Sequence, residues 1–147
     1  MNLKIYYAHS KRIYGTPREK SEREFLEQHF KEVLCPNRDM GEKGSIEPYL
    51  RAIETVEAVV CSEYKDHIGR GVFDEITFAM NKKMAVYCLR EIEAMKRALI
   101  KVASAAIVDA NDWAVRYAKV QLTEEVLPVN QTDFITRPSP AFFCRRP

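Results

Sequence analysis

The chain has 147 residues, a formal net charge of +2 and a hydrophobic fraction of 46%. These values fit one globular domain and exclude a fibrous or a disordered chain. The net charge is too small to indicate a surface for a nucleic-acid polymer. No apolar run approaches the ~18 residues of a membrane-spanning helix and no targeting segment is visible, so we expect a cytoplasmic protein that does not bind a membrane.

Four cysteines are distributed along the chain, at positions 35, 61, 88 and 144. They form no C-x-x-C pair. This spacing indicates neither a zinc site nor a dense disulfide framework. Buried free thiols are therefore the expected state of these side chains, and the spacing of the cysteines gives no reason to expect a metal.

Apolar runs of strand length alternate with helix signals in the first half of the chain. The predicted strands are residues 3–8, 32–35 and 57–62. A helix should begin at Thr16 and Pro17, with Glu19 placed to close a capping box, and should end near Lys31. A second helix should begin at Ser45 and turn its apolar face to the sheet.

The same alternation continues in the second half. The predicted elements are a helix, a strand, a short helix and a strand at residues 72–81, 84–89, 92–99 and 105–109. A last helix should turn Trp113 and Tyr117 toward the core. Residues 1–127 would then form the domain. Residues 128–147 hold four prolines and two adjacent phenylalanines, so we expect an extended tail that packs on the domain or on a neighbouring subunit of a homo-oligomer.

Alternating strands and helices predict an α/β domain in which right-handed crossovers connect parallel strands. We expect a single flavodoxin-like or Rossmann-like domain with a five-stranded parallel sheet in the order 2-1-3-4-5. This order places the first and third strands side by side. The loops that follow them, residues 8–16 and 62–71, should therefore border the crevice in which such sheets bind ligands.

The loop after the first strand carries groups that suit a nucleotide. Its aromatic and polar side chains could hold a flat polar ring. They are Tyr7, His9, Ser10 and Tyr14. Arg12 offers positive charge to a phosphate. The alternative is a purely structural role, which is common for single histidines and tyrosines after a strand.

The loop after the third strand is rich in charged residues and ends with two glycines. Its candidates for ligand binding are Glu63, Asp66, His67, Gly69, Arg70 and Gly71. The Gly-x-Gly step before the predicted helix could present backbone N–H groups to an anion. Glycines that only permit a tight turn between strand and helix are the alternative.

Glu75 is the leading candidate for chemistry. Its spacing from Val72 and Ala79 places it at the edge of the apolar face of the predicted helix, whereas Asp74 need not face inward. A carboxylate at the rim of the core, below a ligand crevice, is costly unless the site solvates it or a reaction uses it. A surface glutamate stabilised by the helix dipole is the alternative.

Two segments of the chain carry a resemblance to a known family. The segment Ile-Tyr-Tyr-Ala-His-Ser at 5–10 is similar to the aromatic-x-Ala-Gly segment of the nucleoside 2-deoxyribosyltransferase-like superfamily. The segment Gly-Val-Phe-Asp-Glu-Ile-Thr-Phe-Ala at 71–79 is similar to its Gly-Thr-x-x-Glu-x-Gly-x-Ala helix start. This superfamily includes nucleoside deoxyribosyltransferases and 2'-deoxynucleoside 5'-monophosphate N-glycosidases.

The resemblance implies cleavage of, or transfer at, the N-glycosidic bond of a nucleoside or nucleotide, with neither a metal nor an organic cofactor required. The nucleophilic glutamate of the family corresponds to Glu75. The tyrosine that positions it corresponds to Tyr7 or Tyr6, of which we assign Tyr7. A (deoxy)ribosyl ester of Glu75 would form and would pass to water or to a second base.

The leaving base also needs a proton in this reaction. Asp66 stands where the family has an aspartate-rich segment, and Glu63 and His67 are further candidates for the general acid. His9 and Val72 replace a glycine and a threonine of the family pattern. These departures favour the alternative function, a non-enzymatic nucleotide-binding or signalling module of the same fold.

Overall fold

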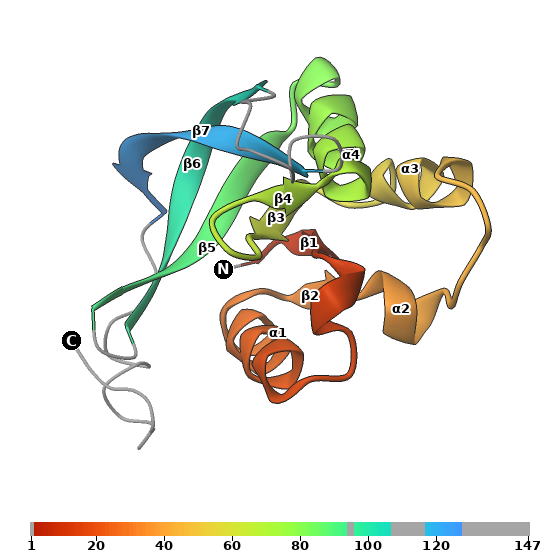
Figure 1. The fold of residues 1–147 in the computed structure, drawn as a ribbon, viewed down its shortest axis with the longest axis horizontal. Coiled ribbons are helices and arrows are strands. Elements are labelled where there is room, and N and C mark those ends of the chain that lie inside the picture. The colour runs from red at the N-terminus through yellow and green to blue at the C-terminus, as the bar shows by residue number, and fades with distance from the viewer. Residues whose placement is uncertain (1, 94–95, 107–116, 128–147) are drawn as a thin grey trace.

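The computed structural model describes residues 2–93, 96–106 and 117–127, which form a sheet with helices on both faces (Figure 1). The strands are β1 (Lys4–Ala8), β2 (Glu32–Leu34), β3 (Ala58–Ser62), β4 (Ile68–Gly69), β5 (Ala85–Glu93), β6 (Lys96–Ala106) and β7 (Tyr117–Val126). The helices are α1 (Pro17–His29), α2 (Pro36–Asp39), α3 (Glu47–Ile53) and α4 (Arg70–Asn81), with a 3-10 turn, η1 (Lys11–Ile13).

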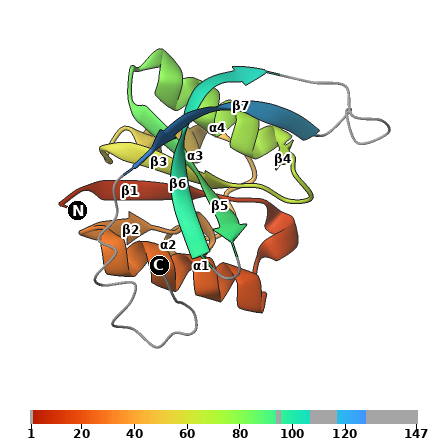
Figure 2. The ribbon, with the colours of Figure 1, turned by 90° about the vertical axis from the view of Figure 1, so that its left-hand side faces the viewer.

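The sheet is mixed, with the strand order β2-β1-β3-β5-β6-β7-β4. The strands β2, β1, β3 and β5 are parallel, which confirms the predicted α/β class and the order of the first four predicted strands. The predicted five-stranded parallel sheet is wrong. The strands β6, β7 and β4 each run antiparallel to the strand before them in the sheet, and β7 passes beside α4 to reach β4 (Figure 2).

The helix predicted at residues 92–99 is wrong, because this segment belongs to β5 and β6 where the structure describes it. Residues 92, 95 and 99 have helical spacing, but Ile92 is exposed and Leu99 lies on β6 in the core. Pairing with β5 satisfies the backbone groups of β6, and its β-branched residues favour a strand. Tyr117 begins β7 instead of lying on a helix. Trp113, most of the strand predicted at 105–109 and the tail at 128–147 lie outside the described residues.

The start of α1 agrees with its sequence signals. The Thr16 side chain accepts a hydrogen bond from Glu19 N at 3.2 Å, and Pro17 occupies the first turn. Gly15, just before this cap, has a φ of +73°, a conformation that favours glycine. The loop that leaves β1 therefore ends in a tight turn that leads directly into a capped helix.

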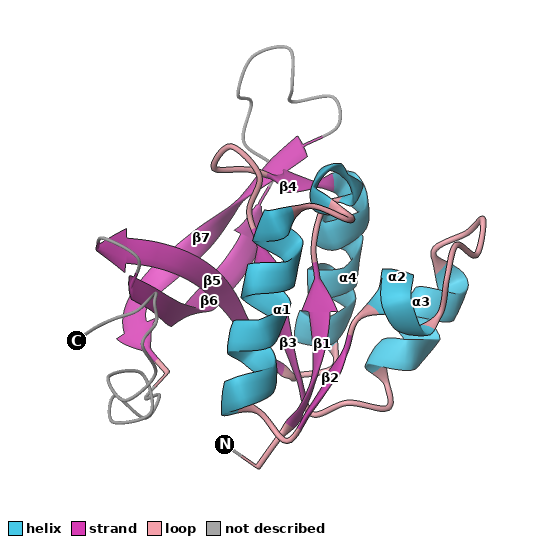
Figure 3. Cartoon of the chain, turned by 90° about the horizontal axis from the view of Figure 1, so that it is seen from below, coloured by secondary structure: helices cyan, strands magenta, loops and turns pink. Residues whose placement is uncertain are grey.

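Alternation along β1 divides the core into two layers, because successive side chains of a strand point to opposite faces. Ile5 and Tyr7 pack in the layer covered by α1. Tyr6 and Ala8 pack in the layer covered by α3 and α4. Figure 3 shows α1 and α4 on opposite sides of β1. The two tyrosines of β1 thus belong to different faces of the molecule.

Two further expectations concern cysteines and membrane segments. Cys35, Cys61 and Cys88 are buried free thiols, as predicted, whereas Cys144 lies outside the described residues. Within the described part of the chain, no helix has both the length and the apolar character needed to cross a bilayer.

Candidate functional site

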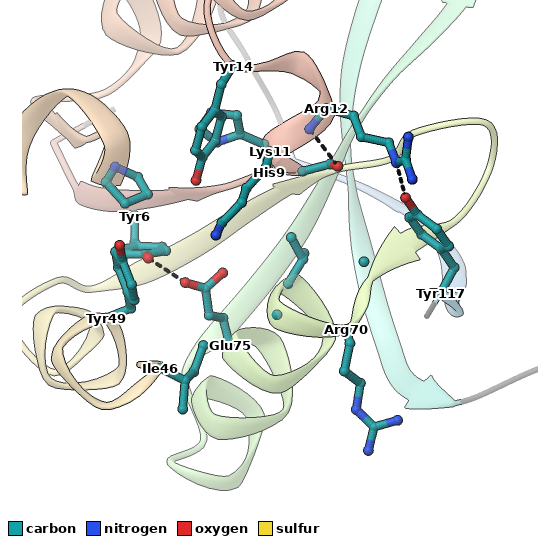
Figure 4. Close-up of a pocket in the computed structure, with 15 residues that line it drawn as sticks. Tyr6, His9, Lys11, Arg12, Tyr14, Ile46, Tyr49, Arg70, Glu75 and Tyr117 are labelled. Carbon is teal, nitrogen blue, oxygen red and sulfur yellow. Dashed lines mark hydrogen bonds between the residues drawn. The ribbon is translucent and has the colours of Figure 1, made fainter. Parts of the chain in front are cut away.

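A cavity of about 460 Å³ lies at the carboxyl end of β1, between the η1 loop, the segment that joins α2 to α3, and the N-terminus of α4 (Figure 4). The structure brings most of the predicted site residues together around it. These are His9, Ser10, Arg12, Tyr14, Gly69, Arg70, Gly71 and Glu75. The loop after β1 and the start of α4 meet here because β1 and β3 are neighbours in the sheet.

Glu75 and Tyr6 form the central contact of the cavity. The Tyr6 hydroxyl donates a hydrogen bond to Glu75 Oε2 at 2.5 Å, and both side chains are buried, with Glu75 only 7% exposed. Glu75 is therefore not the exposed glutamate of the alternative interpretation. Among the described residues, the second carboxylate oxygen, Oε1, has no hydrogen-bond partner. It is the carboxylate oxygen that remains for a ligand.

Burial raises the pKa of Glu75 to about 7, and the neighbouring Asp74 acts in the same direction. The hydrogen bond from Tyr6 opposes both effects, because it stabilises the ionised carboxylate. Burial and the adjacent Glu75 also raise the pKa of the Tyr6 hydroxyl, so Tyr6 keeps its proton and remains the donor. Glu75 therefore changes its charge near neutral pH.

Three tyrosines border the cavity in addition to Tyr6. Tyr14 lies near Glu75, and burial followed by the charge of Glu75 raises the pKa of Tyr14. The Tyr49 hydroxyl donates to Gly41 O at 2.9 Å, which ties α3 to the preceding loop. Tyr117, at the start of β7, accepts a hydrogen bond from Arg12 Nε. The sequence analysis did not identify Tyr49 or Tyr117 as a site residue. Tyr117 was predicted to lie in the core, on the last helix.

The two arginines of the site differ in where they point. The Arg12 guanidinium lies 5.7 Å from the centre of the Tyr117 ring and is held at the cavity wall. Arg70 is 61% exposed, pairs with Asp74 at 3.5 Å and points away from Glu75 (Figure 4). Arg12 is therefore the better placed of the two arginines to meet a bound anion.

The neighbouring tyrosine of β1 does not line the cavity, so the assignment of Tyr7 as the residue that positions Glu75 is wrong. The Tyr7 hydroxyl lies on the α1 face, where it donates to Glu22 Oε1 at 2.6 Å. Because α4 covers the opposite face of β1, Tyr6 is the tyrosine that reaches Glu75.

The three candidates for the general acid also lie outside the cavity lining. Glu63 pairs with Arg90 at 3.0 Å, and Glu63 and Asp66 line a separate cleft beside α1 and β5. The Asp66 side chain is 80% exposed. His67 Nδ1 lies 2.9 Å from Lys65 O in a tight turn. This turn places Lys65 and Asp66 at positive φ, and backbone hydrogen bonds between Tyr64 and His67 close it.

His9 forms part of the cavity wall, and both of its ring nitrogens are fixed. Nδ1 lies 3.0 Å from Tyr7 O and Nε2 lies 2.6 Å from Glu19 Oε2, while the ring stacks on Tyr7. Burial opposes ionisation of Glu19, but hydrogen bonds from Gly15, His9 and Asn37 outweigh it and lower the pKa of Glu19. The predicted ligand residue His9 is therefore anchored from behind by an ionised carboxylate.

Comparison of the chain with known proteins gave no match: no family model, no curated protein and no solved structure is significantly similar to it. The function of the cavity is therefore inferred from the chemistry of its own side chains, together with the two segments at 5–10 and 71–79 that meet in it.

Proposed function

We propose that the cavity binds a nucleoside or a nucleoside 5'-monophosphate and that Glu75 cleaves its N-glycosidic bond. The (deoxy)ribosyl group would pass to water or to a second base. The observation that carries the proposal is the buried Glu75 carboxylate, which faces the cavity and is held by Tyr6. A carboxylate whose burial shifts its pKa toward neutrality, and which lies in a cleft, is typical of a functional group.

In the proposed reaction, ionised Glu75 attacks the anomeric carbon while the bond from that carbon to the base nitrogen breaks. The base leaves with the bonding electron pair and takes a proton from water. Attack by water on the resulting glycosyl ester releases the sugar and restores the carboxylate. Attack by a second base would instead form a new nucleoside. The hydrogen bond from Tyr6 to Oε2 leaves Oε1 for the first attack.

The size and lining of the cavity support a ligand of this class. Its volume of about 460 Å³ lies within the range of small-molecule sites. Tyr14 and Tyr49 line it close to Tyr6 and offer flat rings to a base (Figure 4). Arg12 offers a guanidinium to a 5'-phosphate.

Incubation of the purified protein with a panel of purine and pyrimidine nucleosides and their 5'-monophosphates tests this function. Chromatography would measure the free base. We expect at least one compound to release base faster than a protein-free control. Release from no member of the panel would contradict the enzymatic function.

A second function is favoured by one specific observation. Glu75 is the one carboxylate that the described residues contribute to the cavity lining, and all three predicted general acids lie elsewhere. A cavity without a second carboxyl group to protonate the leaving base suits a non-enzymatic nucleotide-binding or signalling module. Calorimetric binding of a panel member that loses no base would support this second function.

A further inference from the structure

Behind the cavity wall, three potential metal ligands from different elements converge. His9 follows β1, Glu19 lies in the first turn of α1, and Cys35 precedes α2. One ligand atom from each residue lies within 4.8 Å of the other two, and all three side chains are buried. Their sequence spacing hides this cluster, because the three residues meet only after β1, α1 and β2 have packed together.

The neighbours of the cluster hold its donor atoms in place. The Tyr7 carbonyl oxygen lies 3.0 Å from His9 Nδ1, an arrangement that directs Nε2 toward the cluster. Gly15 N donates to Glu19 Oε1 at 2.8 Å, so Oε2 is the carboxylate oxygen that faces His9. Hydrogen bonds of this kind orient the metal ligands in known metal sites.

Both nitrogens of His9 face oxygen atoms that can only accept hydrogen bonds, the Tyr7 carbonyl and the Glu19 carboxylate. A neutral imidazole carries one proton and can satisfy only one of these contacts. In the tautomer that donates from Nδ1 to Tyr7 O, the lone pair of Nε2 faces Glu19 Oε2, and this contact requires a positive partner between the two atoms. A second proton meets this requirement, and so does a metal cation.

The geometry points to a buried zinc site formed by His9 Nε2, Glu19 Oε2 and Cys35 Sγ. Nitrogen, sulfur and carboxylate oxygen are the donors that Zn²⁺ takes in proteins. Asn37 lies beside these donors, because its Oδ1 accepts from Cys35 Sγ at 3.2 Å and its Nδ2 donates to Glu19 Oε2 at 2.8 Å. Metal–ligand bonds of about 2.0–2.3 Å separate tetrahedral donors by roughly 3.3–3.6 Å, so the 2.6 Å contact between His9 and Glu19 would widen by about 1 Å or less.

The zinc ion would join the η1 loop to α1 and α2 and so fix one wall of the cavity. Of the three ligands, His9 also lines the cavity, and so does Pro36, the residue that follows Cys35. This inference does not depend on the reaction proposed for Glu75, because none of the three ligands takes part in that reaction.

The test uses the full chain after treatment with a chelator, titrated with Zn²⁺ alone. Calorimetry should give one Zn²⁺ per chain, and Zn²⁺ should raise the unfolding temperature. The chain loaded with Co²⁺ should show the charge-transfer absorption of a cobalt–thiolate bond. Cys35→Ser should abolish this absorption and weaken Zn²⁺ binding at least about tenfold.

Cys88→Ser and Cys144→Ser are the matched controls, because the first removes a buried thiol on β5 and the second removes the thiol outside the described residues. Both variants should keep the cobalt absorption and the Zn²⁺ affinity. This comparison of the two controls with the unmodified chain can be made even if Cys35→Ser does not fold. No Zn²⁺ binding to the unmodified chain, or loss of the absorption in either control, would overturn the zinc site.

Discussion

The hydroxyls of Tyr6 and Tyr7, which are neighbours on β1, donate to carboxylates on opposite faces of the sheet. Tyr6 bonds Glu75 on α4 at 2.5 Å, and Tyr7 bonds Glu22 on α1 at 2.6 Å. The two contacts are chemically alike, but only the first lies at the cavity. The chain therefore contains a matched pair of positions for separating a role in catalysis from a role in stability.

Tyr6→Phe should lower the rate of base release. The substitution removes the hydrogen bond that lowers the pKa of Glu75, so this pKa should rise above about 7 and less Glu75 is ionised at neutral pH. We expect kcat/KM at pH 7 to fall roughly tenfold or more, with partial recovery at higher pH.

Tyr7→Phe is the control for that variant. It should leave kcat/KM unchanged and lower the free energy of unfolding by about 1 kcal/mol, because the buried Glu22 loses one donor. Turnover and denaturant unfolding are measured for both variants. Equal losses of turnover would show that Tyr6 has no specific role in the reaction.

The pH dependence of turnover should follow the ionisation of Glu75. A nucleophilic carboxylate must be charged, so kcat/KM should rise with pH through about 7 and then level off. Steady-state rates between about pH 5 and pH 9 provide the profile. A rate that falls with increasing pH through the same range would show that protonated Glu75 is the active form, which is incompatible with a nucleophile.

Glu75→Gln should stabilise the fold at neutral and alkaline pH. Because the pKa of Glu75 is raised from 4.5 to about 7 on folding, the folded state binds more protons between these values, and stability falls as pH rises. Glutamine removes this cost, which is on the order of 1–3 kcal/mol above pH 7 and vanishes below about pH 4.5. Denaturant unfolding at pH 4 and pH 8 should show the difference at pH 8 alone.

Asp66→Asn should leave base release unchanged. Its side chain is 80% exposed and lies outside the cavity lining, although the resemblance made it a candidate general acid. The measured kcat/KM should agree with that of the unmodified protein within about twofold. A loss of more than about tenfold would mean that the loop at 62–71 closes over the cavity when substrate binds.

Sequence signals predicted those elements of the fold that depend mainly on residues close together in the chain. Thr16, Pro17 and Glu19 together specify a helix start, and α1 begins there. The four parallel strands β1, β2, β3 and β5 follow from short apolar runs that alternate with helix signals. In contrast, β6 and β7 form by pairing with β5 and with each other, and long-range pairing leaves no periodic signature that distinguishes residues 92–99 from a short helix.

The candidate site likewise combines features that local sequence patterns predict with features that depend on how distant elements pack. Helical spacing was sufficient to place Glu75 at the edge of the core. Alternation along β1 shows that Tyr6 and Tyr7 point apart, but which of them meets Glu75 depends on the face that α4 covers. Asp66 lies outside the cavity lining, in a turn in which Lys65 and Asp66 have positive φ. The residue types of this turn do not indicate that conformation.

Base release by Glu75→Gln, compared with the unmodified protein, tests the proposed nucleophile most directly. The substitution keeps the size of the side chain and an oxygen acceptor for Tyr6 but removes the charged oxygen that would attack the anomeric carbon. Nucleotide binding should be retained and the fold should be at least as stable as that of the unmodified protein, while base release falls by a factor of about 10³ or more. Turnover within about threefold of the unmodified protein, by a variant that is folded, would contradict the proposed role of Glu75.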